Sequence, residues 1–125
     1  MDQQLQNLAA RLYERRGEAV LVPFARRSMS NWEPQPKCCY QNVDLWIEQH
    51  PNCKAIRGWL VSIEEGFPVA RFIPHSVIEE PDGTLVDITP TPVPLTRPFL
   101  RHEEGNEDFD DVVGDNMIIF LDHHL

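Results

Sequence analysis

The chain has 125 residues, 42% of them hydrophobic and 25% charged, so residues 1–125 are expected to form a single globular domain rather than a disordered segment. A formal net charge of −9 excludes a protein that binds nucleic acid through a basic surface, because phosphate recognition needs clustered Lys and Arg. No apolar run is long enough to cross a bilayer, and the first residues lack the basic and apolar regions of a secretory signal. We therefore expect a cytoplasmic protein, or one exported without a cleaved signal peptide.

The first half of the chain is predicted to hold two helices joined by extended and irregular segments. A stripe of leucines at helical spacing predicts a helix over residues 3–16. The apolar run 19–22 predicts a short buried strand, and residues 28–37, with two prolines, predict an irregular approach. The next helix is predicted to begin at residue 38 or 39 and to run to about residue 50. One face of it carries Cys39, Asn42, Val43, Trp46 and His50.

The second half is predicted to be mainly β structure. Residues 55–63 predict a strand that ends in an acidic turn, and residues 72–79 and 84–88 predict a hairpin. The fold class is therefore α+β, with N-terminal helices packed on an antiparallel sheet. After the hairpin we expect an extended proline-rich segment over 90–98, a solvated acidic loop over 102–111 and a last strand over 117–121.

The hairpin turn fixes which side chains share a face. Its Pro-Asp-Gly sequence is typical of a type I turn followed by a left-handed glycine, which sets Glu80 opposite Thr84. In that register Asp87 lies opposite Val77, and His75 is its diagonal neighbour on the same face. The two side chains are then within reach of an imidazole–carboxylate hydrogen bond. The alternative is an ordinary polar contact on an exposed sheet face.

Cys39 is the cysteine best placed to act as a nucleophile. All three cysteines are interpreted as thiols, because their number is odd and a cytosol is reducing. A helix N-terminus lowers the pKa of a thiol, and Cys39 stands where that terminus is predicted. Cys38 is the rival, rotated by roughly 100° around the helix. Cys53 is interpreted as structural, and a small buried hydrophobic residue is the alternative for each thiol.

Backbone N–H groups at the same helix start can form an oxyanion hole. Gln35 or Asn31, both upstream of Cys39, could add a side-chain donor. Asn42 either lines the site or caps a neighbouring backbone group, and Trp59 is either a cleft wall or, the favoured interpretation, part of the core.

A zinc site is the alternative use of these cysteines. His50 and Cys53 have the spacing of a ligand pair, and Cys38 and Cys39 could complete a set. Structural zinc sites usually use two close-spaced pairs such as C-x2-C, however, and adjacent cysteines chelate one ion poorly. The other histidines are predicted to be exposed; they are His102, His123 and His124. No metal or other cofactor is expected.

The order of these residues resembles a known family. The segments Cys39-Tyr-Gln-Asn-Val, Gly58-Trp59, His75-Ser-Val and 82–90 (Asp-Gly-Thr-Leu-Val-Asp-Ile-Thr-Pro) are similar to small bacterial and phage proteins with a C-H-x-N, G-W, H-S/A and D-G-x-x-x-D-x-T-P pattern. Over about residues 35–90 the chain thus resembles the papain-like/transglutaminase-like cysteine hydrolase fold. The resemblance implies Cys39 as nucleophile, His75 as base and Asp87 as the residue that orients it. Tyr40 departs from the pattern, since a histidine is common there.

The function expected is a thiol-dependent acyl-transfer enzyme of the amidase, peptidase or deamidase type, acting on a peptide or small amide. The alternative is a non-catalytic interaction module on the same fold, whose acidic residues 102–111 would contact a basic protein partner. No nucleic-acid or membrane partner is expected. Hydrolysis, deamidation and acyl transfer share the same chemistry, so the sequence leaves the choice among them open.

Overall fold

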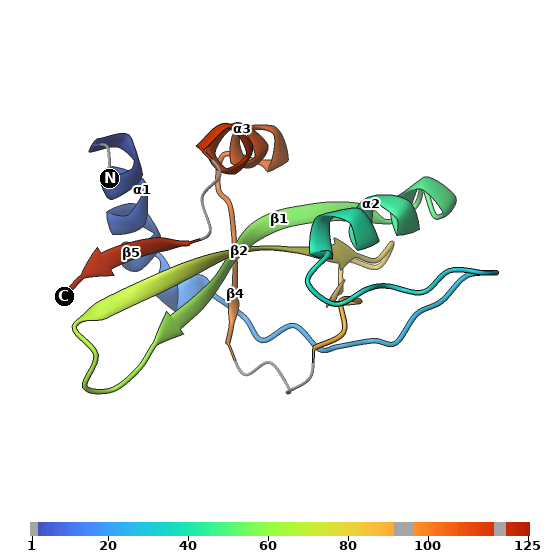
Figure 1. The fold of residues 1–125 in the computed structure, drawn as a ribbon, viewed down its shortest axis with the longest axis horizontal. Helices are drawn as coiled ribbons and strands as arrows, with labels where there is room; N and C mark the ends of the chain where they lie inside the picture. Colours follow the sequence, from blue (N-terminus) through green and yellow to red (C-terminus); the bar gives the residue numbers. More distant parts are fainter. Residues whose placement is uncertain (1–2, 92–96, 117–119) are drawn as a thin grey trace.

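The computed structural model describes residues 3–91, 97–116 and 120–125, and it confirms a mixed α+β architecture in which helices pack on an antiparallel sheet (Figure 1). The helices are α1 (Gln3–Glu14), the short 3-10 helix η1 (Arg16–Glu18), α2 (Cys39–Gln49) and α3 (Asn106–Asn116). The strands are β1 (Lys54–Ile63), β2 (Val69–Glu79), β3 (Leu85–Val86), β4 (Phe99–Arg101) and β5 (Leu121–His124).

The long β1–β2 hairpin is the centre of the sheet. Its strands pair from Lys54 with Glu79 through Ile63 with Ala70, and β4 pairs with the other edge of β1. The outer edge of β2 is shared, because β5 pairs with its first residues, 69–72, and β3 with its last, 78–79. Between them, residues 73–77 have no strand partner on that edge within the described ranges. His75 lies in this gap.

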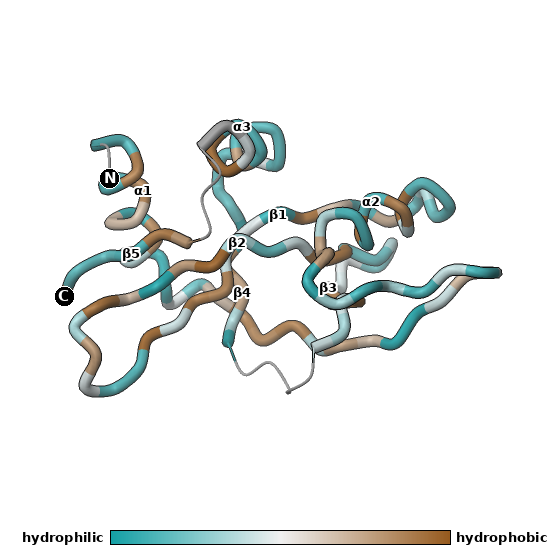
Figure 2. Tube along the Cα trace, in the orientation of Figure 1, coloured by the Kyte–Doolittle hydropathy of each residue, from teal (hydrophilic) through white to brown (hydrophobic). Residues whose placement is uncertain are grey.

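Three clusters of apolar side chains hold the layers together. On one face of the sheet α1 packs through Leu12, and α3 through Phe109, against Trp59. On the same hairpin, nearer its Glu79 end, α2 packs through Val43 and Trp46. A third cluster includes Ile56, Leu60, Val77 and Phe99. Figure 2 shows apolar residues interspersed with hydrophilic ones along β1 and β2 and along the helices that pack on them.

The predicted helices are confirmed, since α1 ends within two residues of the prediction and α2 begins at Cys39. Their apolar stripes explain both: α1 buries Leu8 and Leu12, and α2 buries Val43 and Trp46. None of the helices in the described part of the chain combines the length and apolar character needed to traverse a bilayer.

The buried strand predicted over 19–22 is wrong. The segment makes one isolated bridge, between Val20 and Phe99, and Val20 and Leu21 are 50% and 68% exposed. An apolar run forms a strand only where a neighbour offers a ladder, and the one neighbour it bridges, β4, is only three residues long. Figure 2 shows this apolar run as an extended segment outside the strands.

The acidic loop predicted over 102–111 is also wrong, because most of it belongs to α3. Phe109 is buried, and Val112 and Val113 pack against the same cluster, which is the i, i+3, i+4 spacing of a helix. Glu107 and Asp108 lie in the first turn, where negative charge is favoured by the helix dipole. Strand β4 was not predicted. Residues 92–96 of the expected extended segment and 117–119 of the last expected strand lie outside the described residues, and β5 begins at Leu121.

Candidate active site

The predicted hairpin register is confirmed, and it brings His75 and Asp87 to one place. The Glu80 N–H donates to the Thr84 carbonyl at 2.8 Å, and the Gly83 N–H donates to the Glu80 carbonyl at 2.9 Å. Gly83 has a φ of +90°, the left-handed conformation that this turn needs. Glu79 pairs with Leu85, so the residues that face each other follow the spacing deduced from the turn.

His75 and Asp87 form a buried hydrogen-bonded pair. The Nε2 atom of His75 lies 2.6 Å from Oδ2 of Asp87, and the two residues are 8% and 3% exposed. The second carboxylate oxygen, Oδ1, accepts the backbone N–H of Thr89 at 3.0 Å. Both oxygens of Asp87 are therefore held, and the imidazole keeps only Nδ1 for another partner.

The thiol of Cys39 also acts on this imidazole. Burial lowers the pKa of His75. Hydrogen bonding and negative charge from Asp87 and Cys39 raise it, and their combined effect outweighs burial, so the net pKa is about 9. His75 is therefore protonated at neutral pH. A protonated imidazole between a carboxylate and a thiol is the arrangement that stabilises a thiolate.

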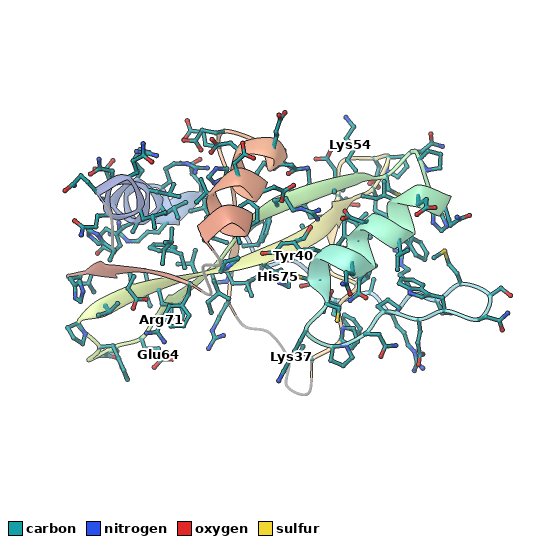
Figure 3. The ribbon with its side chains drawn as sticks, turned by 45° about the horizontal axis from the view of Figure 1, so that its top comes forward. Lys37, Tyr40, Lys54, Glu64, Arg71 and His75 are labelled. Atoms are coloured by element: carbon teal, nitrogen blue, oxygen red, sulfur yellow. The ribbon has the colours of Figure 1, made fainter. Side chains whose placement is uncertain are left out.

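Cys39 is the first residue of α2, and Figure 3 shows His75 near the first turn of that helix, which also carries Tyr40. Cys38 is the N-cap residue, and it makes no side-chain capping hydrogen bond. Lys37, with a φ of +63°, turns the chain into the helix. Of the two adjacent cysteines, Cys39 is the one whose thiol raises the pKa of His75. The helix start leaves backbone N–H groups beside this thiol, as an oxyanion hole requires.

Asn42 caps a neighbouring backbone segment, one of the two roles expected for it. Its Oδ1 accepts the Gln35 N–H at 2.9 Å, and its Nδ2 donates to the Gln35 carbonyl at 2.8 Å. The same Nδ2 donates to Oγ1 of Thr89 at 3.1 Å. Thr89 was not identified from the sequence as part of the site. A signal was present, because the side chain of an Asp often accepts the backbone N–H of the residue two positions later, as Asp87 does from Thr89.

The two side chains expected as oxyanion donors, Gln35 and Asn31, lie at different distances along the loop from the start of α2. Gln35 directly precedes the approach to α2, but its side chain is exposed and donates to the Glu33 carbonyl at 3.1 Å. Asn31 lies at the exposed tip of the loop between α1 and α2, in a turn closed by the Met29–Trp32 bridge. The structure thus keeps Gln35 near the start of α2 and does not bring Asn31 to the triad.

Trp59 belongs to the core, fully buried, with its Nε1 donating to Nδ1 of His102 at 3.2 Å. Tyr40 likewise points into the protein, where its ring lies 5.1 Å beneath the Arg57 guanidinium and 6.1 Å from Phe109. Tyr40, the residue that departs from the pattern described above, is therefore a packing residue between α2 and α3.

His102 is buried, contrary to the expectation of an exposed loop residue. Its Nε2 lies 2.7 Å from Asp108, and His102, Glu104 and Asp108 form the one group of potential metal ligands within the described residues. Because Nδ1 accepts the Trp59 N–H, the neutral ring carries its proton on Nε2, the atom that faces the carboxylates. This tautomer has no lone pair to offer a metal there, so the group is a structural His–carboxylate pair.

The zinc set considered from the sequence is not assembled. His50 uses Nδ1 against the Trp46 carbonyl at 2.9 Å and stacks on the Trp46 ring at 3.8 Å. The Cys53 thiol donates to Glu80 at 3.8 Å, and burial followed by the charge of Glu80 raises its pKa. Cys53 is therefore a buried, protonated thiol, as its structural interpretation requires.

No protein-family model, curated protein or solved structure matches this chain.

Proposed function

We propose that this protein is a thiol-dependent acyl-transfer enzyme with a papain-like core, of the amidase, peptidase or deamidase type. Cys39 is the nucleophile, His75 the acid and base, and Asp87 the residue that orients and charges the imidazole. The observation that carries the proposal is the buried pair between His75 and Asp87, 2.6 Å apart, together with the Cys39 thiol, which raises the pKa of the same imidazole.

In the proposed mechanism the attacking form is a Cys39 thiolate beside a protonated His75, formed when the Cys39 proton lies on His75. The thiolate attacks the acyl carbon, and the resulting oxyanion is held by backbone N–H groups at the start of α2. As the C–N bond breaks, His75 gives its proton to the leaving amine, and a thioester remains on Cys39. Water or an amine then attacks the thioester, His75 takes the proton of that nucleophile, and the thiolate is restored.

A partly apolar cavity adjoins the Asp87 side of this site. It has a volume of about 510 Å³, and its lining includes Asp87 and Thr89 as well as the apolar side chains of Leu21 and Phe24. Leu21 and Phe24 are 68% and 54% exposed, so they form an accessible apolar surface next to the triad. This surface suits an amide or peptide with an apolar group near the bond that is cleaved.

The alternative, an interaction module with an acidic surface, is less well supported. Six carboxylates lie between residues 103 and 111, and four of them face a cation or histidine of the same chain. These are Glu103 with Arg15, Glu104 with Arg11, Asp108 with His102 and Asp110 with Arg57. Much of the acidic charge is thus balanced internally. A binding module also has no need for a buried His75–Asp87 pair, which costs desolvation free energy.

The test is alkylation by iodoacetamide as a function of pH, read for each cysteine by peptide mass spectrometry. Cys39 should react fastest at pH 6, and Cys53, whose thiol is buried and protonated, should react slowest. His75→Ala should slow Cys39 at pH 6 without changing Cys53, which serves as the internal control. If Cys39 reacts like Cys38 in both proteins, the proposed nucleophile is wrong.

A further inference from the structure

We infer that Asn42 is a positioning residue for the proposed reaction. It fixes two segments to the helix that carries Cys39: the chain leading into the start of α2, where the oxyanion would bind, and the chain that follows Asp87. This inference rests on the proposed function and adds a residue to it. Its basis is that a single buried amide, 2% exposed, hydrogen-bonds two separate segments that flank the thiol.

The first segment is the approach to α2. Asn42 exchanges two hydrogen bonds with the backbone of Gln35, accepting its N–H at 2.9 Å and donating to its carbonyl at 2.8 Å. Two such hydrogen bonds hold the backbone of one residue in position and orientation, as in a strand ladder. The chain from Gln35 to Cys39 is thereby held at both ends of a short loop. This loop sets where the first N–H groups of α2, and the Gln35 side chain, stand relative to the thiol.

The second segment is the chain that leaves the hairpin. Asn42 donates to Oγ1 of Thr89 at 3.1 Å, and the Thr89 N–H donates to Oδ1 of Asp87 at 3.0 Å. The other oxygen of Asp87 holds His75 at 2.6 Å. A continuous chain of hydrogen bonds therefore runs from Asn42 to the imidazole.

Asparagine suits this place because its planar amide offers one acceptor and two donors, and all three are used. Aspartate would lose both donors. Because Asn42 follows Cys39 by three residues on α2, the amide and the thiol project from the same side of one helix. Any shift of Gln35 or Thr89 is thus a shift relative to the nucleophile, and displacements of about 1 Å can cost about 100-fold in rate.

Two probes separate positioning from reactivity of the thiol. Acylation of Cys39 by p-nitrophenyl acetate passes through an oxyanion, whereas alkylation by iodoacetamide does not. In Asn42→Ala, the acylation rate at the alkaline plateau should fall about 10- to 100-fold, while the alkylation plateau changes by less than about twofold. Thr89→Val, which removes only the hydroxyl, should reduce acylation less, and its effect should largely vanish in the Asn42→Ala background.

Asn106→Ala is the matched control. Asn106 also accepts a backbone N–H, from Arg57 at 2.9 Å, and donates to a backbone carbonyl, that of Ala55 at 2.6 Å. It should keep wild-type acylation. Wild-type acylation in folded Asn42→Ala, or an equal loss in Asn106→Ala, overturns the inference. If Asn42→Ala does not fold, unchanged acylation in Thr89→Val overturns it. Failure of the proposed function looks different, since Cys39 then alkylates no faster than Cys38 and His75→Ala changes nothing.

Discussion

Gly58 lies directly opposite His75 in the β1–β2 ladder, and β4 crosses so close to it that a side chain has no room. A Cβ atom placed on Gly58 would lie 2.3 Å from the Leu100 carbonyl oxygen and 2.7 Å from Cζ of Phe99. The tight crossing at Gly58 brings β4 against β1 at the level of the His75 imidazole. Phe99 also meets the His75 ring edge to face, with the ring centres 6.3 Å apart.

Gly58→Ala should therefore destabilise the protein by about 1–3 kcal/mol or more, because the β4 backbone must move to admit a methyl group. Urea denaturation measures this change. Gly114→Ala in α3 is the control, since its Cβ would meet nothing within 4 Å and alanine is the better helix former. It should be neutral or stabilising by up to about 1 kcal/mol. Equal stability of Gly58→Ala and wild type would show that β4 does not lie against Gly58.

Stability should fall as the pH rises from about 6.5 to about 9, owing to His75. Its pKa in the folded protein is about 9, above the 6.5 of an unperturbed histidine, so the folded state holds a proton that the unfolded state releases in this range. The stabilisation is complete below pH 6.5 and is lost as the pH passes through 9. The slope from this one group reaches about 1.4 kcal/mol per pH unit.

Asp87→Asn should reduce that alkaline slope. Without the carboxylate, the hydrogen bond and charge of Asp87 no longer raise the pKa of His75 while burial still lowers it, so the folded-state pKa falls from about 9 and less stability is lost between pH 6.5 and pH 9. Urea denaturation at pH 6 and pH 9 tests this. Asp82→Asn, in the exposed turn of the same hairpin, should keep the wild-type slope, because Asp82 has a lowered pKa and titrates only in acid. A slope in Asp87→Asn equal to that of wild type would contradict the assignment.

Cys39→Ala should lower the pKa of His75, but by less than Asp87→Asn does. The thiol contributes a hydrogen bond and charge that raise the His75 pKa, and both of these effects are smaller than the corresponding ones from Asp87. Titration of the histidine ring signals by NMR measures the shift, with the His75 signals assigned as those missing in His75→Gln. Cys38→Ala is the control and should leave the titration unchanged. An unchanged His75 pKa in Cys39→Ala would place the thiol away from the ring.

His102→Leu should destabilise the protein by about 1–3 kcal/mol, because the buried Trp59 N–H loses its acceptor. Excess zinc should leave the thermal midpoint of the wild type unchanged, since the ring nitrogen facing Glu104 and Asp108 carries the proton. A differential thermal melt with and without zinc checks this. His124→Ala, at an exposed position of β5, should change stability by less than about 0.5 kcal/mol. Stabilisation by zinc that disappears in His102→Leu would establish a metal site instead.

Local chemistry determined much of the site. The Pro-Asp-Gly turn fixes its own geometry and the register of the strands beside it, so the meeting of His75 and Asp87 could be predicted from spacing alone. The start of α2 at Cys39 could also be predicted from local sequence, because an irregular proline-containing segment is followed there by an apolar stripe of helical period.

Tertiary structure decided the rest. Nothing in the spacing tells whether the run 19–22 finds a ladder partner, or whether an acidic stretch contains the buried Phe109. Each of these depends on which surfaces approach from distant parts of the chain, where burial outweighs local propensity. The hydrogen bond from Asn42 to Thr89 joins residues 47 positions apart, and it forms only because α2 packs beside the chain that leaves the hairpin. The sequence by itself therefore determined the parts of the candidate site, and the packing of α2 against the sheet determined that they form one.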